Sequence, residues 1–319
     1  MPADALGHRR HILDLDDFTR TELAGVLTTA QSMRQVLSRD IKKVPSLRGK
    51  VVVTLFLEAS TRTRVSFEQA GKMLSADVIN ISGSGSSAEK GESLLNTALT
   101  LQAMHADLLI IRSPHSGAPY FLARNLPRTG VVNAGDGRHA HPTQALLDLL
   151  TMRDHLGELA GRKIVIVGDV LHSRVARSDI HGLGLEEAQV VLSGPPTLLP
   201  PSWAALPAHV SVEPDLDAAV EGADVVMALR IQKERMEGGM LPSMREYSRR
   251  WGVTEQRMGR ANPGALLMHP GPMNEGLEIA SSLAHGARAQ IEDQVTNGVA
   301  VRMAVLYQLL TGTTNGVNA

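Results

Sequence analysis

Apolar and polar residues follow one another along this chain in blocks that predict strands and helices in turn. Continuous apolar runs such as VVVTLFL (51–57) and KIVIV (163–167) are typical of buried strands. Between such runs, apolar residues recur at helical spacing. In the first half we predict strands at 50–57, 76–82, 107–113 and 130–135, and helices at 20–37, 66–75, 94–105, 118–125 and 141–156.

A second alternation begins after a glycine-marked break at 157–163. There we predict strands at 163–169, 188–194, 223–230 and 265–272, and helices at 174–183 and 287–310. Strands that alternate with helices imply parallel sheets, because a parallel connection must cross over the sheet.

The predicted fold class is therefore α/β, with two domains that are each a parallel sheet flanked by helices. The first domain is expected at 1–145, with the C-terminal helix 288–319 packing back on it, and the second at 146–287. Long helices are expected to join the two domains.

Polar residues gather where the predicted strands end, at Ser60–Arg64, Arg112, Arg230 and His269–Pro272. Open parallel sheets bind ligands outside the carboxyl ends of their strands. We therefore expect one crevice between two sheets to collect these groups.

The segment STRTR (60–64) joins a predicted strand to a predicted helix. The first backbone N–H groups of a helix are unpaired and favour an anion, and hydroxyl and guanidinium groups add donors that suit phosphate. The segment thus indicates a phosphate-binding site without a P-loop. The alternative is a helix cap whose arginines are merely solvated. Two arginines within one turn argue against this alternative.

Histidine and glutamine share a helical face in HPTQ, where His141 and Gln144 lie three residues apart. The neighbouring glycine-rich turn (134–140) allows close approach of a ligand, whereas a lone histidine more often has a structural role. We interpret His139, in the same turn, as structural.

Further cations have weaker signals. Arg174 and Arg177 open a predicted helix, and either suits a carboxylate, although a solvated face is the better interpretation of Arg177. Arg230 and Gln232 form a polar pair after a strand, and Lys90 lies in a Gly/Ser-rich loop of the kind that acts as a lid. The alternative for Arg112 and Lys90 is simple solvation. The turn after 163–167 lacks GxGxxG, so a dinucleotide-binding dehydrogenase is rejected.

Composition narrows the class of protein further. The 319 residues include 43% hydrophobic and 20% charged residues, and 32 basic residues balance 33 acidic ones, so no nucleic-acid partner is expected. There is no cysteine, which excludes disulfides and thiolate zinc sites and is compatible with the cytoplasm. Residues 1–18 lack the apolar core of a signal peptide, and no membrane span or metal site is expected.

Four segments together carry a resemblance to a known family. FLEASTRTRVSFE (56–68), HPTQALLDL (141–149), LRIQKER (229–235) and HPGPMNEGLEI (269–279) are similar to transcarbamoylases, specifically to aspartate carbamoyltransferase catalytic chains. The segments occur in the family's order, and the resemblance covers essentially the whole chain. It implies carbamoyl transfer from carbamoyl phosphate to the amine of L-aspartate, toward pyrimidines, by an enzyme without a cofactor. It also implies that the domains 1–145 and 146–287 bind carbamoyl phosphate and aspartate, respectively.

The resemblance also implies roles for individual residues. Arg62, Thr63, Arg112 and His141 are the expected catalytic groups, with His141 neutral. The expected carbamoyl phosphate contacts are Ser60, Thr61, Arg62, Thr63, Arg112, His141, Gln144, Pro270, Gly271 and Pro272. The expected aspartate contacts are Lys90, Arg174, Arg230 and Gln232. Ser87 and Lys90 match the loop that a neighbouring subunit contributes, so a homotrimer with shared sites is expected. Regulatory chains or a dihydroorotase as further partners are left open.

Two other members of the fold remain as alternatives. Ornithine carbamoyltransferases usually carry HCLP and an Asp-Ser-Met-Gly segment, and neither occurs here. A non-catalytic scaffold homologue would have a damaged phosphate segment, whereas all matched residues are present. The chain departs from some relatives at Met273, where those carry an arginine, and at Ala88–Glu89, where those carry a second lysine.

Overall fold

The computed structural model describes residues 8–83, 92–200, 206–232, 241 and 243–312. The chain forms two compact units. Unit 1 comprises Met1–Leu147 and Thr296–Ala319, and unit 2 comprises Asp148–Val295. Two long helices, α5 (Pro142–Leu156) and α11 (Ile291–Thr311), each begin in one unit and end in the other.

Unit 1 contains a parallel sheet with the strand order β1-β5-β4-β2-β3. Its strands are β1 (His11–Ile12), β2 (Val51–Phe56), β3 (Asp77–Ser82), β4 (Leu108–Ser113) and β5 (Gly130–Asp136). Its helices besides parts of α5 and α11 are α1 (Arg20–Leu37), α2 (Thr61–Met73), α3 (Leu94–Ala103) and α4 (Ala118–Asn125).

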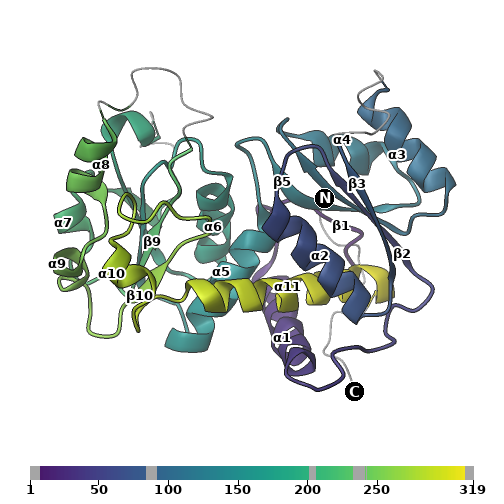
Figure 1. Ribbon diagram of the computed structural model, residues 1–319, viewed down its shortest axis with the longest axis horizontal. Helices are drawn as coiled ribbons and strands as arrows, with labels where there is room; N and C mark the ends of the chain where they lie inside the picture. The colour runs from purple at the N-terminus through teal and green to yellow at the C-terminus, as the bar shows by residue number, and fades with distance from the viewer. Residues whose placement is uncertain (1–7, 84–91, 201–205, 233–240, 242, 313–319) are drawn as a thin grey trace. The chain divides into compact units, whose positions relative to one another are not determined.

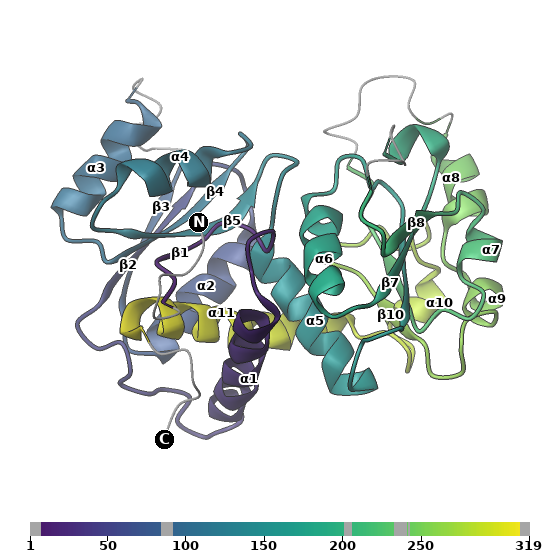
Figure 2. The same ribbon diagram turned by 180° about the vertical axis from the view of Figure 1, so that it is seen from behind.

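Helices cover both faces of this sheet, as the apolar runs require. Figures 1 and 2 show α3 and α4 on one face and α1, α2 and α11 on the other. Alternate positions such as Val53 and Leu55 pack with Leu122 of α4 in one buried cluster. On the opposite face, Gln308 Nε2 of α11 donates to Gly25 O of α1 at 3.1 Å. The C-terminal helix is therefore an integral part of unit 1.

Unit 2 contains a second parallel sheet, with the order β10-β9-β6-β7-β8. Its strands are β6 (Lys163–Val167), β7 (Gln189–Ser193), β8 (Val210–Val212), β9 (Val225–Ala228) and β10 (Leu266–Met268). Its helices are α6 (Arg174–Leu185), α7 (Leu216–Ala219), α8 (Met244–Trp251), α9 (Glu255–Met258) and α10 (Ser281–Ala284), with a 3₁₀ turn, η2, at Pro196–Leu198.

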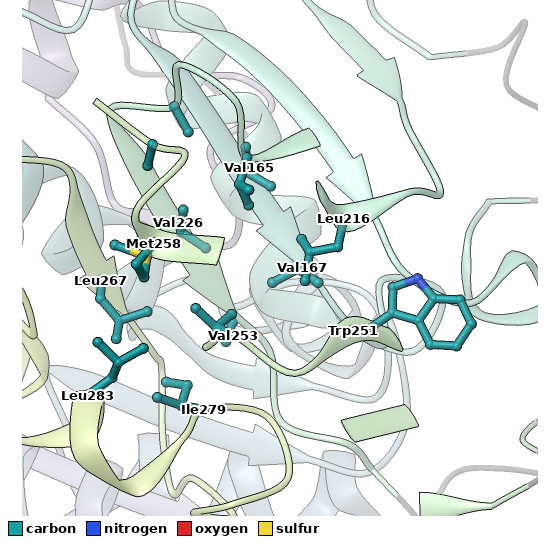
Figure 3. Packing of buried hydrophobic residues seen from close by; sticks show 14 of the residues in the cluster. Val165, Val167, Leu216, Val226, Trp251, Val253, Met258, Leu267, Ile279 and Leu283 are labelled. Atoms are coloured by element: carbon teal, nitrogen blue, oxygen red, sulfur yellow. The ribbon is translucent and has the colours of Figure 1, made fainter. Parts of the chain in front are cut away.

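One face of this second sheet carries a large aliphatic core. Figure 3 shows Val165, Val226 and Leu267, from three adjacent strands, pointing toward Met258 and Leu283 of the covering helices. All five side chains are buried. This packing fixes the three strands whose carboxyl ends bear the candidate residues of unit 2.

The predicted α/β class with two helix-flanked parallel sheets is confirmed, and so are the bounds of α1. The predicted start of α2 at Ser66 is wrong, because the helix begins at Thr61. Four consecutive polar residues have no apolar periodicity, so the pattern hides the first helical turn. The pattern also misses short elements, namely β1, β8 and α7–α10, which contain too few residues for a period to show.

Two further observations concern membrane-spanning helices and metal sites in the described part of the chain. None of its helices is long and apolar enough to cross a bilayer. Its histidine and acidic side chains form no cluster of three or more that could hold a metal ion.

Candidate active site

The order of strands in unit 1 places three candidate segments at one edge of the sheet. β5, β4 and β2 are neighbours, and all run in the same direction. Phe56 lies opposite Arg112 in the register, and Leu57 N donates to Arg112 O at 2.9 Å. The start of α2, the end of β4 and the turn after β5 therefore share the carboxyl edge, as expected for a ligand site.

The segment Ser60–Arg64 forms the N-terminus of α2. Ser60 is the extended N-cap residue (φ −162°, ψ 97°), and its hydroxyl makes no capping hydrogen bond. The first intrahelical bond runs from Arg64 N to Ser60 O at 3.2 Å, and no acidic residue lies in the first turn. Thr61 and Arg62 are exposed, whereas Thr63 is buried. The segment is thus a helix N-terminus of the kind whose unpaired N–H groups and dipole favour an anion.

Arg112 is fixed by two neighbours rather than solvated. Its side chain donates from Nη2 to Glu58 Oε1 at 2.8 Å and from Nη1 to Ala134 O at 3.2 Å, and the residue is 9% exposed. Glu58 lies two residues after the end of β2, so this ion pair connects the ends of two adjacent strands. Glu58 was not predictable from the sequence, because a single acidic residue beside an arginine-rich segment has no distinguishing pattern.

A buried carboxylate, Asp136, organises the turn that leads to His141. Its Oδ1 accepts from Asn133 Nδ2 at 2.8 Å and from Ala140 N at 3.0 Å, and its Oδ2 accepts from Gly117 N at 2.6 Å. The next residue, Gly137, has φ +49°, and a Cβ there would lie 2.4 Å from the Ser116 hydroxyl oxygen. The turn therefore requires glycine, and Asp136 holds its backbone in place.

His141 and Gln144 open α5 directly after this turn. Gln144 N donates to His141 O at 2.9 Å, and both residues are buried. His139, interpreted above as structural, lies with Nδ1 3.2 Å from Asp136 Oδ2. The structure therefore brings Ser60–Thr63, Arg112, His141 and Gln144 to one edge of unit 1, and it gives His139 a role in the supporting turn.

The contact of His139 predicts a pH-dependent contribution to stability. The hydrogen bond to Asp136 raises the pKa of His139 above the ordinary histidine value of about 6.5. The contribution is thus fully present below pH 6.5 and is lost as the pH rises through the folded-state pKa. Because the side chain is 40% exposed, we expect less than about 1 kcal/mol. Denaturant titration should show that His139→Gln destabilises the protein more at pH 5.5 than at pH 8.5; equal losses at both would contradict this.

The candidate residues of unit 2 occupy a corresponding edge. The strands β10, β9 and β6 are adjacent and parallel. The turn 269–272 follows β10, Arg230–Gln232 follow β9, and the loop that leads to Arg174 follows β6. Arg174 is the first residue of α6 and is buried, and the Ser173 hydroxyl caps the helix by accepting from Ala176 N. Arg177 is exposed, in agreement with its interpretation as a solvated residue.

A second buried carboxylate, Asp169, organises the loop after β6. Its Oδ1 lies 2.7 Å from Nδ1 of the buried His172 and accepts from His172 N at 3.2 Å. Burial raises the pKa of Asp169, and these hydrogen bonds oppose the shift. Asp169 thereby holds the loop after β6 that leads to Arg174.

The turn after β10 begins at the buried His269, whose Nδ1 accepts from Gly271 N at 2.8 Å. Pro270 and Gly271 are half-buried, and Pro272 is exposed. Met273, at the position where some transcarbamoylases carry arginine, packs partly buried against the core cluster. Ser87 and Lys90 lie outside the described residues.

Comparisons with known proteins agree along nearly the whole chain. Residues 10–154 match the family model "Aspartate/ornithine carbamoyltransferase, carbamoyl-P binding domain". Residues 160–309 match the model "Aspartate/ornithine carbamoyltransferase, Asp/Orn binding domain". The chain is 58% identical over 303 residues to the aspartate carbamoyltransferase catalytic subunit of Chloroflexus aggregans, with 94% of this chain and 98% of that protein covered.

Solved structures show the same likeness in three dimensions. Aspartate transcarbamoylase from Trypanosoma cruzi in complex with N-(phosphonacetyl)-L-aspartic acid is similar with a TM-score of 0.86 and 28% identity, covering 97% of this chain and 98% of that one. Ornithine carbamoyltransferase from Pyrococcus furiosus is similar with a TM-score of 0.86 and 26% identity, covering 96% and 98%. The backbone alone therefore does not separate the two activities.

Proposed function

Because this chain belongs to the aspartate/ornithine carbamoyltransferase family, we infer that it carries out the reaction of the aspartate-specific members. It transfers the carbamoyl group of carbamoyl phosphate to the amine of L-aspartate, giving N-carbamoyl-L-aspartate and phosphate in pyrimidine biosynthesis. The observation that carries this assignment is the 58% identity to an aspartate-specific catalytic subunit over 94% of the chain. The pair Arg230 and Gln232 supports it, because these side chains suit a carboxylate rather than an ammonium group.

The residues of unit 1 are proposed to bind carbamoyl phosphate. The N-terminus of α2, with Ser60, Thr61, Arg62 and Thr63, suits the phosphate because its donors are already oriented. Thr63, Arg112 and His141 supply donors for the carbamoyl oxygen. In the same proposal, Gln144 and the carbonyl groups of Pro270 and Gly271 orient the carbamoyl NH₂ group.

The residues of unit 2 are proposed to bind aspartate. Arg174 and Arg230, with Gln232, pair with the two carboxylates, and Lys90 of a neighbouring subunit adds a further cation. Positioning two anions for reaction accounts for a large part of the catalysis.

The chemical step then follows from the positions of donors. The amine nitrogen of aspartate attacks the carbamoyl carbon, and the carbonyl oxygen becomes an oxyanion that the Thr63, Arg112 and His141 donors stabilise. The bond from carbon to the phosphate oxygen breaks, and phosphate leaves as an anion on the α2 N-terminus. The departing phosphate takes the proton that the amine loses, so the step needs no protein base.

A direct assay tests this function. Purified protein should form N-carbamoyl-L-aspartate from carbamoyl phosphate and L-aspartate. With L-ornithine in place of aspartate, it should form no citrulline. Citrulline formation would assign the ornithine activity, and the absence of both products would favour a scaffold.

We further propose a cytoplasmic homotrimer, with Ser87 and Lys90 completing the site of a neighbouring copy. Support comes from the sequence resemblance, in which Ser87 and Lys90 match the loop that a neighbouring subunit contributes.

Shared sites predict complementation between two inactive variants. Lys90→Ala lacks the loop cation and Arg62→Ala lacks the phosphate contact, so each alone should be nearly inactive. In randomly mixed trimers about a quarter of the sites combine two intact halves. Activity of the mixture should therefore recover to about that fraction of wild type after dissociation and reassembly. Mixed trimers that show no recovery would contradict shared sites.

A further inference from the structure

A buried glutamate, Glu278, lies between the two loops of unit 2 that carry proposed substrate contacts. Its carboxylate is 0% exposed and follows the 269–274 turn. Oε1 accepts from Ile231 N at 2.9 Å and from Asn274 Nδ2 at 2.7 Å, and Oε2 accepts from Asn274 N at 2.5 Å. One side chain thus holds the backbone between Arg230 and Gln232 and the end of the turn after β10.

The same carboxylate faces the histidine at the start of that turn. His269 Nε2 lies 3.5 Å from Glu278 Oε2. On the other side of the ring, His269 Nδ1 accepts from Gly271 N at 2.8 Å, so the neutral imidazole carries its proton on Nε2, toward the carboxylate. The Glu278 carboxylate therefore lies beside the protonated Nε2, where its charge favours the tautomer in which His269 can hold the backbone of Gly271.

Both carboxylate oxygens of Glu278 act as hydrogen-bond acceptors. Burial alone would raise the pKa of the carboxyl group, but the neighbouring His269 and the hydrogen bonds from Asn274 and from the backbone of Ile231 outweigh it and lower the pKa. A neutral amide in its place would turn an NH₂ group toward donors that need an acceptor, which is costly in a buried site.

We propose that Glu278 is a positioning residue that orients two substrate-contacting loops together. Through Ile231 it sets the backbone of Arg230 and Gln232, and through His269 and Gly271 it sets the carbonyl groups of the turn. This role rests on the proposed function, because those loops contact aspartate and the carbamoyl NH₂ group only in that assignment. Glu278 itself touches neither substrate.

The test is the steady-state behaviour of Glu278→Gln in the full-length protein, with Glu275→Gln as matched control. Glu275 lies in the same turn, has a side chain 45% exposed, and faces the exposed His285 at 3.6 Å. For Glu278→Gln we expect kcat to fall and the KM for aspartate to rise, each by about 10- to 100-fold. The Kd of carbamoyl phosphate alone should change by less than about threefold, because its phosphate contacts lie in unit 1. Glu275→Gln should match wild type.

The contact between His269 and Gly271 N gives a second test, the difference in kcat between two His269 variants. Destabilisation of the fold alone would not produce this difference. His269→Asn keeps an oxygen that can accept from Gly271 N, whereas His269→Leu keeps none. His269→Asn should therefore retain at least about tenfold more kcat than His269→Leu, with the KM for aspartate nearly unchanged in both.

The outcomes separate the two claims. Folded Glu278→Gln with kcat and KM within twofold of Glu275→Gln would overturn the positioning role, as would equal kcat values for the two His269 variants. If Glu278→Gln does not fold, the His269 pair decides alone. A wild type that forms no carbamoyl aspartate would instead overturn the proposed function, and with it this role.

Discussion

Replacing Arg62 with alanine is expected to lower kcat by about 100- to 1,000-fold, which corresponds to about 3–4 kcal/mol of transition-state stabilisation. Arg62 lies in the first turn of α2, where no acidic side chain balances the helix dipole. Its guanidinium is proposed to bind the phosphate as that group gains charge on leaving. Removing it should slow the chemical step more than it weakens the binding of the substrate.

Lys72→Ala is the control for this effect. Lys72 lies in the last turn of the same helix, pairs with Glu68 and has a 62% exposed side chain. Its replacement by alanine therefore removes one charge far from the proposed phosphate contact. Initial rates at saturating concentrations of both substrates should give a kcat for Lys72→Ala that is close to the wild-type value. Near-normal turnover of Arg62→Ala would refute the role of α2 in binding phosphate.

Replacing Arg230 with leucine is expected to act on aspartate alone. Paired hydrogen bonds between a guanidinium and a carboxylate are worth about 3–4 kcal/mol when lost from a shielded site, so kcat/KM for aspartate should fall about 100- to 1,000-fold. The dissociation constant of carbamoyl phosphate, measured by calorimetry without aspartate, should stay within about twofold.

Arg250→Leu is the matched control for Arg230→Leu. Arg250 belongs to the same unit, has a 63% exposed side chain and pairs with Glu246 within α8. It should have no effect on either substrate. An equal loss of carbamoyl phosphate binding and aspartate turnover in Arg230→Leu would show that the arginine maintains the fold rather than binds aspartate.

The sequence predicts those elements whose residues must follow a regular pattern of apolar positions. Buried parallel strands need continuous apolar runs, so β2, β4 and β6 were predictable from those runs alone. The bounds of α1 were predictable because Thr19 and Glu22 form a capping box before an amphipathic segment. The edge position of Ser60–Arg64 and Arg112 followed from the rule that parallel strands share a carboxyl edge.

The supporting carboxylates were not predictable in the same way. Asp136 and Glu278 each accept a hydrogen bond from backbone that is distant in sequence, namely from Gly117 N and from Ile231 N. Such partners are chosen by the folded backbone, and a single acidic residue shows no spacing that reveals them. The first turn of α2 was missed for a related reason, because four consecutive polar residues, Thr61–Arg64, do not follow the apolar pattern of a helix.

The most direct test of the central claim is a crystal structure of this chain with N-(phosphonacetyl)-L-aspartic acid, the compound bound in the similar Trypanosoma cruzi enzyme. Its phosphonate should lie on the N-terminus of α2 against Ser60–Thr63, and its carboxylates should pair with Arg174 and with Arg230 and Gln232. A structure in which the compound binds at another place, or in which its phosphonate lies away from Ser60–Thr63, would contradict this account.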